Sequence, residues 1–375
     1  MAPKVLLPLL LASALVLAQI VHQYVRGNAV QLRTAAAALK MPTAGRHGAR
    51  LRAAVTPATP ATPTTRAALK PPSLRSDGIH AWLVYRRELA LARGDRATFV
   101  QVGANNGWKN DPLIDVLRGK ASWRGYPVRG KEAWVAIQVE PTPSLFADLT
   151  AFHNDTVEWT FVNGVVASTC DAGGTRTFNA VKPGLVGVGG VPSAAAIGQM
   201  NSLNLDHLDP KWTIQVQAAC VSSMEALIAE HGSAAMQAIA QRRAAAMAHD
   251  PLEAARRAAP TQFRIDVLQI DVEGFDADVL QTLDFATVRP AIIEYERVAL
   301  KGKENVALVS KLRKNGYFVH TAGYDVLAID VWQTGLVLED PTAVVKELLK
   351  DNDDATHTGR WKGGVRKGSG WGGEK

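Results

Sequence analysis

Two segments constrain the fold of this chain more than any other part of it. The first, VQVGANNG, covers Val100 to Gly107, and the second, VLQIDVEGFDADVL, covers Val267 to Leu280. In each, an apolar run rich in β-branched residues ends abruptly at glycine, asparagine or a carboxylate and continues into a helix-like stretch. Buried parallel strands end in this way where a sheet opens into a ligand-binding crevice. We therefore expect an open α/β sheet that holds a nucleotide-like cofactor.

Strand-like and helix-like patterns alternate around these segments, which is typical of a mostly parallel sheet with flanking helices. The expected strands are 98–103, 134–139, 157–167 with a bend at Gly164, 212–221, 263–272, 291–298, and a closing antiparallel pair at 317–322 and 326–331. The expected helices are 78–93, 112–117, 143–152, 224–230, 275–283 and 305–315. Three segments break the alternation: a basic insertion at 118–132, a glycine-rich loop at 182–198, and an Ala- and Arg-rich stretch at 234–259 that predicts an exposed helix pair broken at Pro251.

The first segment has the features of a ligand-binding turn. Gly103 permits a tight turn and a close approach of the backbone to a ligand, while Asn105 and Asn106 tolerate unusual backbone angles and donate hydrogen bonds. Gly107 leaves space before the following helix. The turn lacks the G-x-G-x-x-G spacing of a dinucleotide site, and the sequence holds no G-x-x-x-x-G-K-[ST] phosphate loop. These features favour a ligand without a phosphate group.

A second expected strand ends at Glu140, in the stretch IQVEP. A carboxylate at this place can accept hydrogen bonds from both hydroxyls of a ribose. The alternative for Glu140 is an acidic residue that stabilises the N-terminus of the next helix. Glu140 follows Gly107 by 33 residues, against the usual ~20 between such a turn and its carboxylate, and the insertion at 118–132 accounts for the difference.

Four carboxylates lie at the ends of two further strands. Asp271 and Glu273 are two residues apart, and Glu294 and Glu296 repeat this spacing after the next strand. Neighbouring strand ends bring such side chains beside the cofactor crevice, where they serve as a general base or hold a hard cation. We predict catalytic roles for Asp271 and Glu294 and no metal ion, with a divalent cation as the alternative. Helix capping is the alternative for Asp271 and Glu273, and for Glu296 we expect a surface ion pair with a following basic residue.

Together, VQVGANNG, IQVEP, LQIDVEGFDADVL and IIEYE resemble the FkbM family of S-adenosylmethionine-dependent methyltransferases, over about residues 98–331. The resemblance implies a class I, Rossmann-like sheet of seven strands and methyl transfer, usually to a hydroxyl oxygen of a sugar or another small metabolite. It also implies that Glu140 holds the ribose of the cofactor and that Asp271 lies closest to the transferred methyl group. It assigns the methionine part to Gly103, Asn105 and Gly107, and the adenine to Asn163 and Gly164.

One departure from the family pattern and two rival functions stay open. Many members carry an acid where this chain has Gln101, which weakens any role of this position in binding the amino group of the cofactor. A non-catalytic, methyltransferase-like binding protein is therefore one alternative. A type II glycosyltransferase of the secretory pathway is the other, with Asp271 and Glu273 holding a metal ion and a sugar nucleotide. The leading hypothesis is an O-methyltransferase that acts on a glycan or a small-molecule acceptor.

The first 76 residues differ in composition from the rest. Residues 5–21 form an uncharged apolar run at the short end of what spans a bilayer, and we predict a signal-anchor or signal peptide over residues 1–25. A Pro-, Ala- and Thr-rich stem over 26–76 is expected to be disordered, as is a tail over 351–375, and the methyltransferase domain is expected at 77–350. We expect a single-pass membrane protein facing the Golgi lumen. A secreted protein, or a plastid or mitochondrial one after processing, is the alternative.

Charge and cysteine content narrow the choice of partners and compartment. The net charge is +7, but residues 1–75 hold ten Lys or Arg and no acid, which leaves 32 basic against 35 acidic residues in the remainder. This distribution gives no reason to expect nucleic-acid binding. Cys170 and Cys220 fit no metal-binding spacing, and we expect two buried thiols, with a disulfide as the alternative in a lumenal domain. The stretch Asn154-Asp155-Thr156 is an N-glycosylation sequon on an expected surface loop.

Overall fold

The computed structural model describes residues 69, 71–73, 78–107, 113–120, 123, 125–156, 158–182, 211, 213–248, 261–298, 300–322, 324–330 and 333–334. All of them belong to the compact unit formed by residues 62–375. The expected anchor, most of the stem and the C-terminal tail lie outside the described residues, as do nearly all of the loop at 182–198 and the break at Pro251. Among the helices that the structure describes, none combines the length and the apolar character needed to cross a bilayer.

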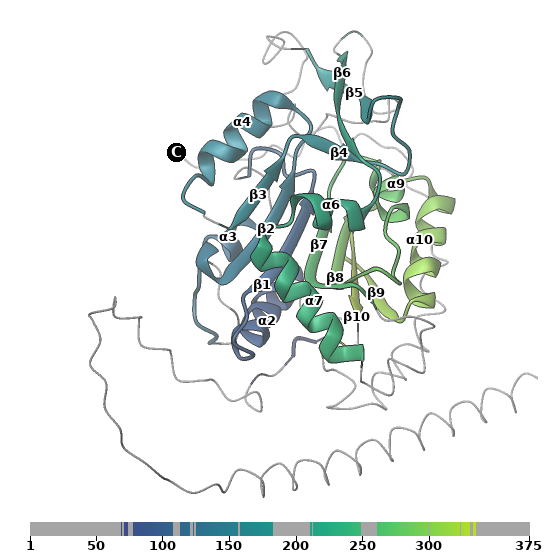
Figure 1. The fold of residues 1–375 in the computed structure, drawn as a ribbon. Coiled ribbons are helices and arrows are strands. Elements are labelled where there is room, and N and C mark those ends of the chain that lie inside the picture. Colours follow the sequence, from purple (N-terminus) through teal and green to yellow (C-terminus); the bar gives the residue numbers. More distant parts are fainter. Residues whose placement is uncertain are drawn as a thin grey trace, which may run out of the picture. The chain divides into compact units, whose positions relative to one another are not determined.

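A seven-stranded sheet forms the centre of the molecule (Figure 1). Its strand order is β3-β2-β1-β7-β8-β10-β9. The bounds are β1 Ala97–Val102, β2 Trp134–Val139, β3 Trp159–Val162, β7 Phe263–Ile270, β8 Val288–Glu296, β9 Tyr317–Ala322 and β10 Asp325–Asp330. Strands β3, β2, β1, β7 and β8 run parallel, and β10 pairs antiparallel with both β8 and β9. The predicted seven-stranded, mostly parallel sheet and its closing antiparallel pair are confirmed.

The order of the strands defines where a ligand crevice can open. The chain builds outward from β1 to β2 and β3, and then returns to place β7 on the other side of β1. In open α/β sheets, ligands bind at the carboxyl ends of the strands where the direction of winding reverses. In this sheet that point lies between β1 and β7. The strand ends within the segments 100–107 and 267–280 therefore lie next to each other.

Helices cover both faces of the sheet (Figure 1). Their bounds are α2 Ile79–Leu91, α3 Ile114–Leu117, α4 Pro143–Phe152, α6 Met224–His231, α7 Ala234–Ala248, α9 Asp276–Gln281 and α10 Gly302–Lys314, with a short 3-10 turn η2 at Lys131–Ala133. Side chains of α2 and α3 pack with Phe99, Val267 and Ile292 in one core cluster. Side chains of α6, α7, α9 and α10 pack with Val100 and Leu268 in the other. The buried strands read as continuous apolar runs because both of their faces are covered.

A second, three-stranded sheet corrects one prediction. It consists of β4 Gly164–Val166, β6 Thr213–Val221 and β5 Thr175–Val181, in the order β4-β6-β5. The single bent strand expected over 157–167 is therefore two strands in different sheets, β3 and β4, separated by Asn163. Gly164 makes the change of partner possible, because a Cβ at this residue would lie 2.7 Å from the Ala219 carbonyl oxygen of β6.

The expectation of two buried thiols was wrong. Cys170 and Cys220 form a disulfide with a Cα–Cα distance of 5.7 Å, and both residues are partly exposed. The bond joins the loop after β4 to the last residues of β6. Fifty residues separate the two cysteines, so only the pairing of β4 with β6 brings them together.

The exposed helix pair expected at 234–259 also requires correction. Its described part, α7, packs against the sheet, with Met236, Ile239, Ala240 and Ala244 buried. Arg243 of α7 is buried as well, and its guanidinium donates to Asp266 of β7. The high content of Ala and Arg hid this packing in the sequence, because an arginine counts as a surface residue unless its buried partner is known.

Candidate active site

The turn after β1 brings the ends of three strands together. Gly103 and Ala104 both donate their backbone N–H groups to the carbonyl oxygen of Val139 in β2, over 3.0 and 2.9 Å. On the other side, the N–H of Asp271 donates to the carbonyl oxygen of Val102. Gly103 adopts φ +87°, and a Cβ here would lie 1.8 Å from the carbonyl oxygen of Asp271. Gly103 is therefore required both by the turn and by the contact between the ends of β1 and β7.

Glu140 lies in the same turn region and is 4% exposed. One carboxylate oxygen accepts the Asn105 N–H at 2.9 Å, and the other accepts the Thr142 N–H at 2.8 Å. Burial raises the pKa of Glu140 to about 7, against the lowering effect of these hydrogen bonds. A carboxylate has about four acceptor positions, and the Thr142 side chain also bonds to Glu140, so these contacts leave about one position for a ribose hydroxyl. The free acceptor position of Glu140 therefore fits the ribose of the predicted cofactor.

The remaining residues of the turn hold its shape. Asn105 adopts the left-handed conformation, with φ +52°, and its side-chain oxygen accepts the Asn106 N–H at 2.7 Å. Gly107 lies against α4 and the residue after it, since a Cβ there would come within 2.5 Å of Leu149 and 2.8 Å of His153. His153 is fully buried, and burial lowers its pKa to about 4. Gly107 therefore packs the turn onto the helix layer.

Asn163 and Gly164 follow β3 at the same edge of the sheet. The exposed Asn163 donates its side-chain N–H groups to the carbonyl oxygens of Glu140, at 2.9 Å, and Pro141, at 3.2 Å. Asn163 thus braces the backbone that carries the Glu140 carboxylate. Gly164 belongs to β4, where it pairs with Ala219.

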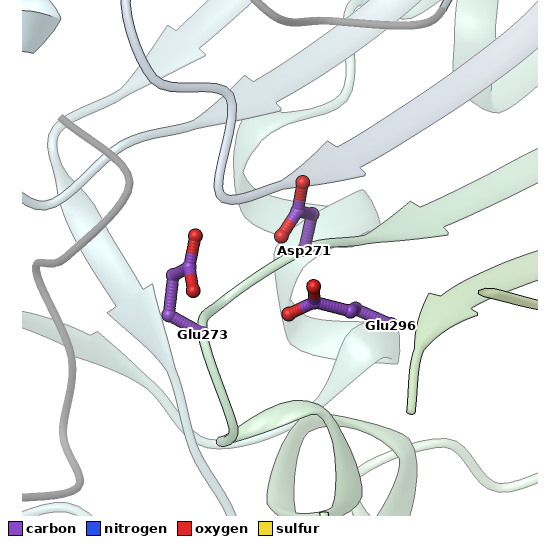
Figure 2. A group of neighbouring side chains, drawn as sticks. All are labelled: Asp271, Glu273 and Glu296. Atoms are coloured by element: carbon purple, nitrogen blue, oxygen red, sulfur yellow. The ribbon is translucent and has the colours of Figure 1, made fainter. Parts of the chain in front are cut away.

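Three carboxylates converge beside this turn, and we call them the acidic trio: Asp271, Glu273 and Glu296. They contribute oxygen atoms that all lie within 4.8 Å of one another, and Figure 2 shows the three side chains directed toward a common centre. Burial, followed by the charges of Asp271 and Glu296, raises the pKa of Glu273 to about 8. Burial and the charges of Asp271 and Asp325 raise the pKa of Glu296 to about 7. Such a group can accept a proton near neutral pH or hold a hard cation.

Asp276, at the start of α9, fixes the positions of the trio. It is fully buried; one of its carboxylate oxygens accepts the Glu296 N–H at 3.1 Å, and the other accepts the Gly274 N–H at 3.3 Å. Asp276 thus ties the turn that carries Glu273 to the end of β8. Burial and the charges of Asp271 and Glu296 raise the pKa of Asp276 well above its usual value. The sequence marked this acid as part of the family pattern but gave it no role.

The structure places the two glutamates of β8 differently from what the sequence led us to expect. Glu296, expected in a surface ion pair, belongs to the acidic trio, and among the described residues its Oε2 is buried without a hydrogen-bond partner. Glu294, expected to act with Asp271 in catalysis, is not a member of the trio and is 6% exposed within the sheet. Strand β8 ends at Glu296, so Glu296 rather than Glu294 lies at the carboxyl edge of the sheet.

A row of buried polar side chains crosses the sheet below the site, and sequence reasoning missed it. The strand pairings place its members in register on β2, β1, β7 and β8, where in-register residues of parallel strands face the same side. We call it the polar row: Gln138, Gln101, Gln269 and Glu294, all less than 7% exposed. The Gln138 amide donates to the Gln101 side-chain oxygen at 2.6 Å. Gln101 is therefore one member of a row and not an isolated substitution.

Each member of the polar row precedes a site residue by two positions. The sequence signal was a polar residue at the first position of the tripeptides QVG, QVE, QID and EYE. The third residues of these tripeptides are Gly103, Glu140, Asp271 and Glu296 respectively. Because side chains alternate along a strand, this spacing puts the polar row and the site residues on the same face of the sheet. The strand positions that precede the site residues on this face are thus polar instead of apolar.

Comparison with known proteins supports the resemblance to one family over part of the chain. Residues 255–319 match the methyltransferase FkbM domain. The matched segment contains β7, α9, β8 and α10, and with them the acidic trio and Asp276. The resemblance to FkbM methyltransferases is confirmed by this match, which supports a methyltransferase. No curated protein and no solved structure matches the chain significantly.

Proposed function

We propose that this protein is an S-adenosylmethionine-dependent methyltransferase that methylates a hydroxyl group of a glycan or another small acceptor. The observation that carries the proposal is the convergence of the Gly103 turn, the Glu140 carboxylate and the acidic trio at one edge of the FkbM-type sheet. The ribose hydroxyls of an adenosyl group need a hydrogen-bond acceptor, and the Glu140 carboxylate can provide one. A sulfonium carries a positive charge, and the acidic trio offers the complementary charge beside it.

The chemistry needs little from the protein besides position and a proton acceptor. When bound, S-adenosylmethionine supplies an electrophilic methyl group on a sulfonium. The Gly103 turn and Glu140 would hold this cofactor, which would give its methyl group to the acceptor oxygen and leave as S-adenosylhomocysteine. The hydroxyl proton passes to a carboxylate of the acidic trio. The raised pKa values of Glu273 and Glu296, about 8 and 7, suit a general base that works near neutral pH.

Ligand binding to the purified protein tests the proposal. We expect S-adenosylhomocysteine to raise the thermal midpoint and to bind in titration calorimetry, and Glu140→Gln to weaken this binding at least tenfold. Glu158→Gln, a change at a partly exposed ion pair before β3, is the control and should bind as the wild type does. A folded wild type that shows no affinity for S-adenosylhomocysteine would contradict the proposal.

The acidic trio is also the observation that favours the rival glycosyltransferase, because carboxylates close together hold the divalent cation that sugar nucleotides require. The same thermal-shift experiment separates the two functions. Stabilisation by a nucleoside diphosphate sugar with Mn²⁺, and none by S-adenosylhomocysteine, would favour the glycosyltransferase. Binding of S-adenosylhomocysteine without methyl transfer to a broad acceptor panel would favour the non-catalytic alternative.

We also propose that the domain works in an oxidising compartment, on the lumenal side of the secretory pathway. The disulfide between Cys170 and Cys220 supports this location, because disulfides persist in oxidising compartments and are rare in the cytosol. The apolar run at residues 5–21 would supply the signal or the membrane anchor. Alkylation of free thiols in protein from intact cells tests the location, and two unmodified, oxidised cysteines are the expected result.

A further inference from the structure

We propose that Asn154 is an N-glycosylation site of the folded domain. The inference rests on the proposed lumenal location and not on the methyltransferase activity. The sequence contains a single N-x-[ST] triplet, Asn154-Asp155-Thr156, and Val157 after it is not a proline. Such triplets often arise by chance, so the proposal depends on where the fold places this one.

The triplet lies in the turn between α4 and β3, and its asparagine is free to carry a glycan. Asn154 is exposed, and its side chain makes no hydrogen bond within the described part of the chain. Its neighbours are held instead. The Asp155 carboxylate accepts from Lys131 at 2.7 Å, and the Thr156 hydroxyl donates to the His153 carbonyl oxygen at 2.6 Å. These contacts anchor the turn on both sides of Asn154 and leave its amide in solvent.

The position of the turn is compatible with a working site. Helix α4 starts after Glu140 at the carboxyl edge of the sheet and returns the chain to the opposite edge, where β3 begins at Trp159. The adjacent Glu158 confirms this placement, since it pairs with Arg96, which precedes the first residue of β1. A glycan on Asn154 therefore projects from the amino edge of the strands. The acidic trio lies at the carboxyl edge, so the glycan does not cover it.

The disulfide gives an independent reason to expect the modification. Glycan transfer to an asparagine and formation of the Cys170–Cys220 bond take place in the same oxidising compartment. The sequon and the disulfide share no residue and no hydrogen bond among the described residues. The disulfide supports the lumenal location that modification of Asn154 requires.

The test uses the full chain expressed in a eukaryotic cell with a secretory pathway, with Asn154→Gln and Thr156→Ser as matched variants. Asn154→Gln removes the sequon, whereas Thr156→Ser retains both the sequon and the hydroxyl. We expect a peptide-N-glycosidase to increase the gel mobility of the wild type and of Thr156→Ser, but not of Asn154→Gln. Peptide mass spectrometry should find Asn154 converted to aspartate by the enzyme. The thermal midpoint of Asn154→Gln should equal that of the enzyme-treated wild type.

The state of the cysteines separates the possible failures. Protein with the Cys170–Cys220 disulfide but without a glycan would overturn the Asn154 proposal and leave the proposed location intact. Protein with two free thiols and no glycan would overturn both. Neither result bears on the methyltransferase proposal, which S-adenosylhomocysteine binding tests separately.

Discussion

Gly103 is the residue on which the geometry of the candidate site depends most directly. Its missing side chain allows the backbone at the end of β1 to lie against the carbonyl oxygen of Asp271. The same contact sets the distance between the turn that precedes Glu140 and the first carboxylate of the acidic trio. At this scale, single atoms decide whether the site forms.

We predict that Gly103→Ala abolishes cofactor binding and lowers the unfolding free energy by well over 2 kcal/mol. Its Cβ would lie 1.8 Å from Asp271 O, in addition to the roughly 1–2 kcal/mol cost of a left-handed alanine. Gly173→Ala is the matched control, because Gly173 has φ +89° and a Cβ there meets nothing within 4 Å. Chemical denaturation of both variants measures the difference. Equal losses in the two variants would show that the contact with Asp271 is unimportant.

The two glutamates of β8 give a second test. We predict that Glu296→Gln lowers kcat about 10²-fold or more, because it removes a proton acceptor from the trio. Glu294→Gln, two residues away in the polar row, should change kcat less than tenfold, since it turns that row into four amides of the same shape. Transfer of labelled methyl groups to an acceptor panel measures both. The reverse ranking would return the catalytic role to Glu294.

The burial and mutual repulsion of the acidic trio predict how the unfolding free energy depends on pH. The pKa of Glu273, about 8, lies above its value in an unfolded chain, so the folded state binds the proton more tightly. Unfolding free energy therefore falls as the pH rises from about 4.5 to about 8. His153, whose pKa is lowered to about 4, has an opposite effect only below about pH 6.5. Between pH 6.5 and 8.5, the carboxylates with raised pKa values therefore affect the unfolding free energy without a contribution from His153.

We predict that Glu273→Gln is more stable than the wild type at pH 8, by about 1–2 kcal/mol after allowance for partial exposure. The advantage should shrink toward pH 6.5, as the wild-type carboxyl becomes protonated. Urea denaturation across this window provides the measurement. Glu230→Gln, an exposed change on α6, is the control and should follow the wild type. A difference in unfolding free energy between Glu273→Gln and the wild type that stays constant across this pH window would contradict the raised pKa of Glu273.

At the scale of elements, the small sheet β4-β6-β5 depends on a covalent link. The Cys170–Cys220 disulfide closes a loop with a sequence separation of 50 residues, which includes β5 and most of β6. The same region contacts the helix that follows the acidic turn, because Ser168 donates its backbone N–H to the Asp278 carboxylate of α9 at 2.9 Å. The disulfide therefore supports a segment adjacent to the acidic trio.

We predict that the double variant Cys170→Ser/Cys220→Ser loses about 2–4 kcal/mol of unfolding free energy, the usual effect of opening a loop of this length. Guanidinium denaturation measures the loss. Wild-type protein treated with a reductant should reproduce the value of the double variant, since both lack the same bond. A variant as stable as the oxidised wild type would mean that the bond restricts the unfolded chain very little.

At the scale of the whole molecule, a buried ion cluster joins the two helix layers through the sheet. The Asp266 carboxylate of β7 accepts from Arg86 of α2, from Arg243 of α7 and from the Thr98 N–H of β1. Burial alone would raise the pKa of Asp266, but Arg243 and Arg86 hold it well below its usual range. This cluster lies at the amino edge of the strands, away from the candidate site.

We predict that Asp266→Asn costs about 3–5 kcal/mol, because it removes the carboxylate that pairs with the buried Arg86 and leaves Arg243 with only its longer ion pair to Asp95. Glu158→Gln, which breaks the partly exposed pair with Arg96, is the control and should cost no more than about 1 kcal/mol. Thermal and urea unfolding measure both changes. Similar losses in the two variants would show that the Asp266 cluster does not hold the layers together.

The main elements of the sheet were predictable because their signals are local. The predicted strand at 134–139 and the helix at 143–152 match β2 and α4 residue for residue, since a nearly continuous apolar run and an initial Pro143 are recognised within a few positions. Gly103, Glu140 and Asp271 were predicted to meet at one edge, and the structure brings them together. Each of them directly follows an apolar strand, and parallel strands end at a common edge.

The sequence by itself determined most strand ends of the large sheet and the residues that follow them, because each depends on side chains close together along the chain. The number of seven strands was implied by the family resemblance and not by these local patterns. Only the tertiary structure decided which carboxylates meet. Glu296 joins Asp271 because β8 extends to the edge, and Glu294 aligns with Gln269 through strand register. The disulfide and the division between β3 and β4 depend on β6, some 50 residues further along the chain. Pairing over that distance is fixed by packing, which no local pattern encodes.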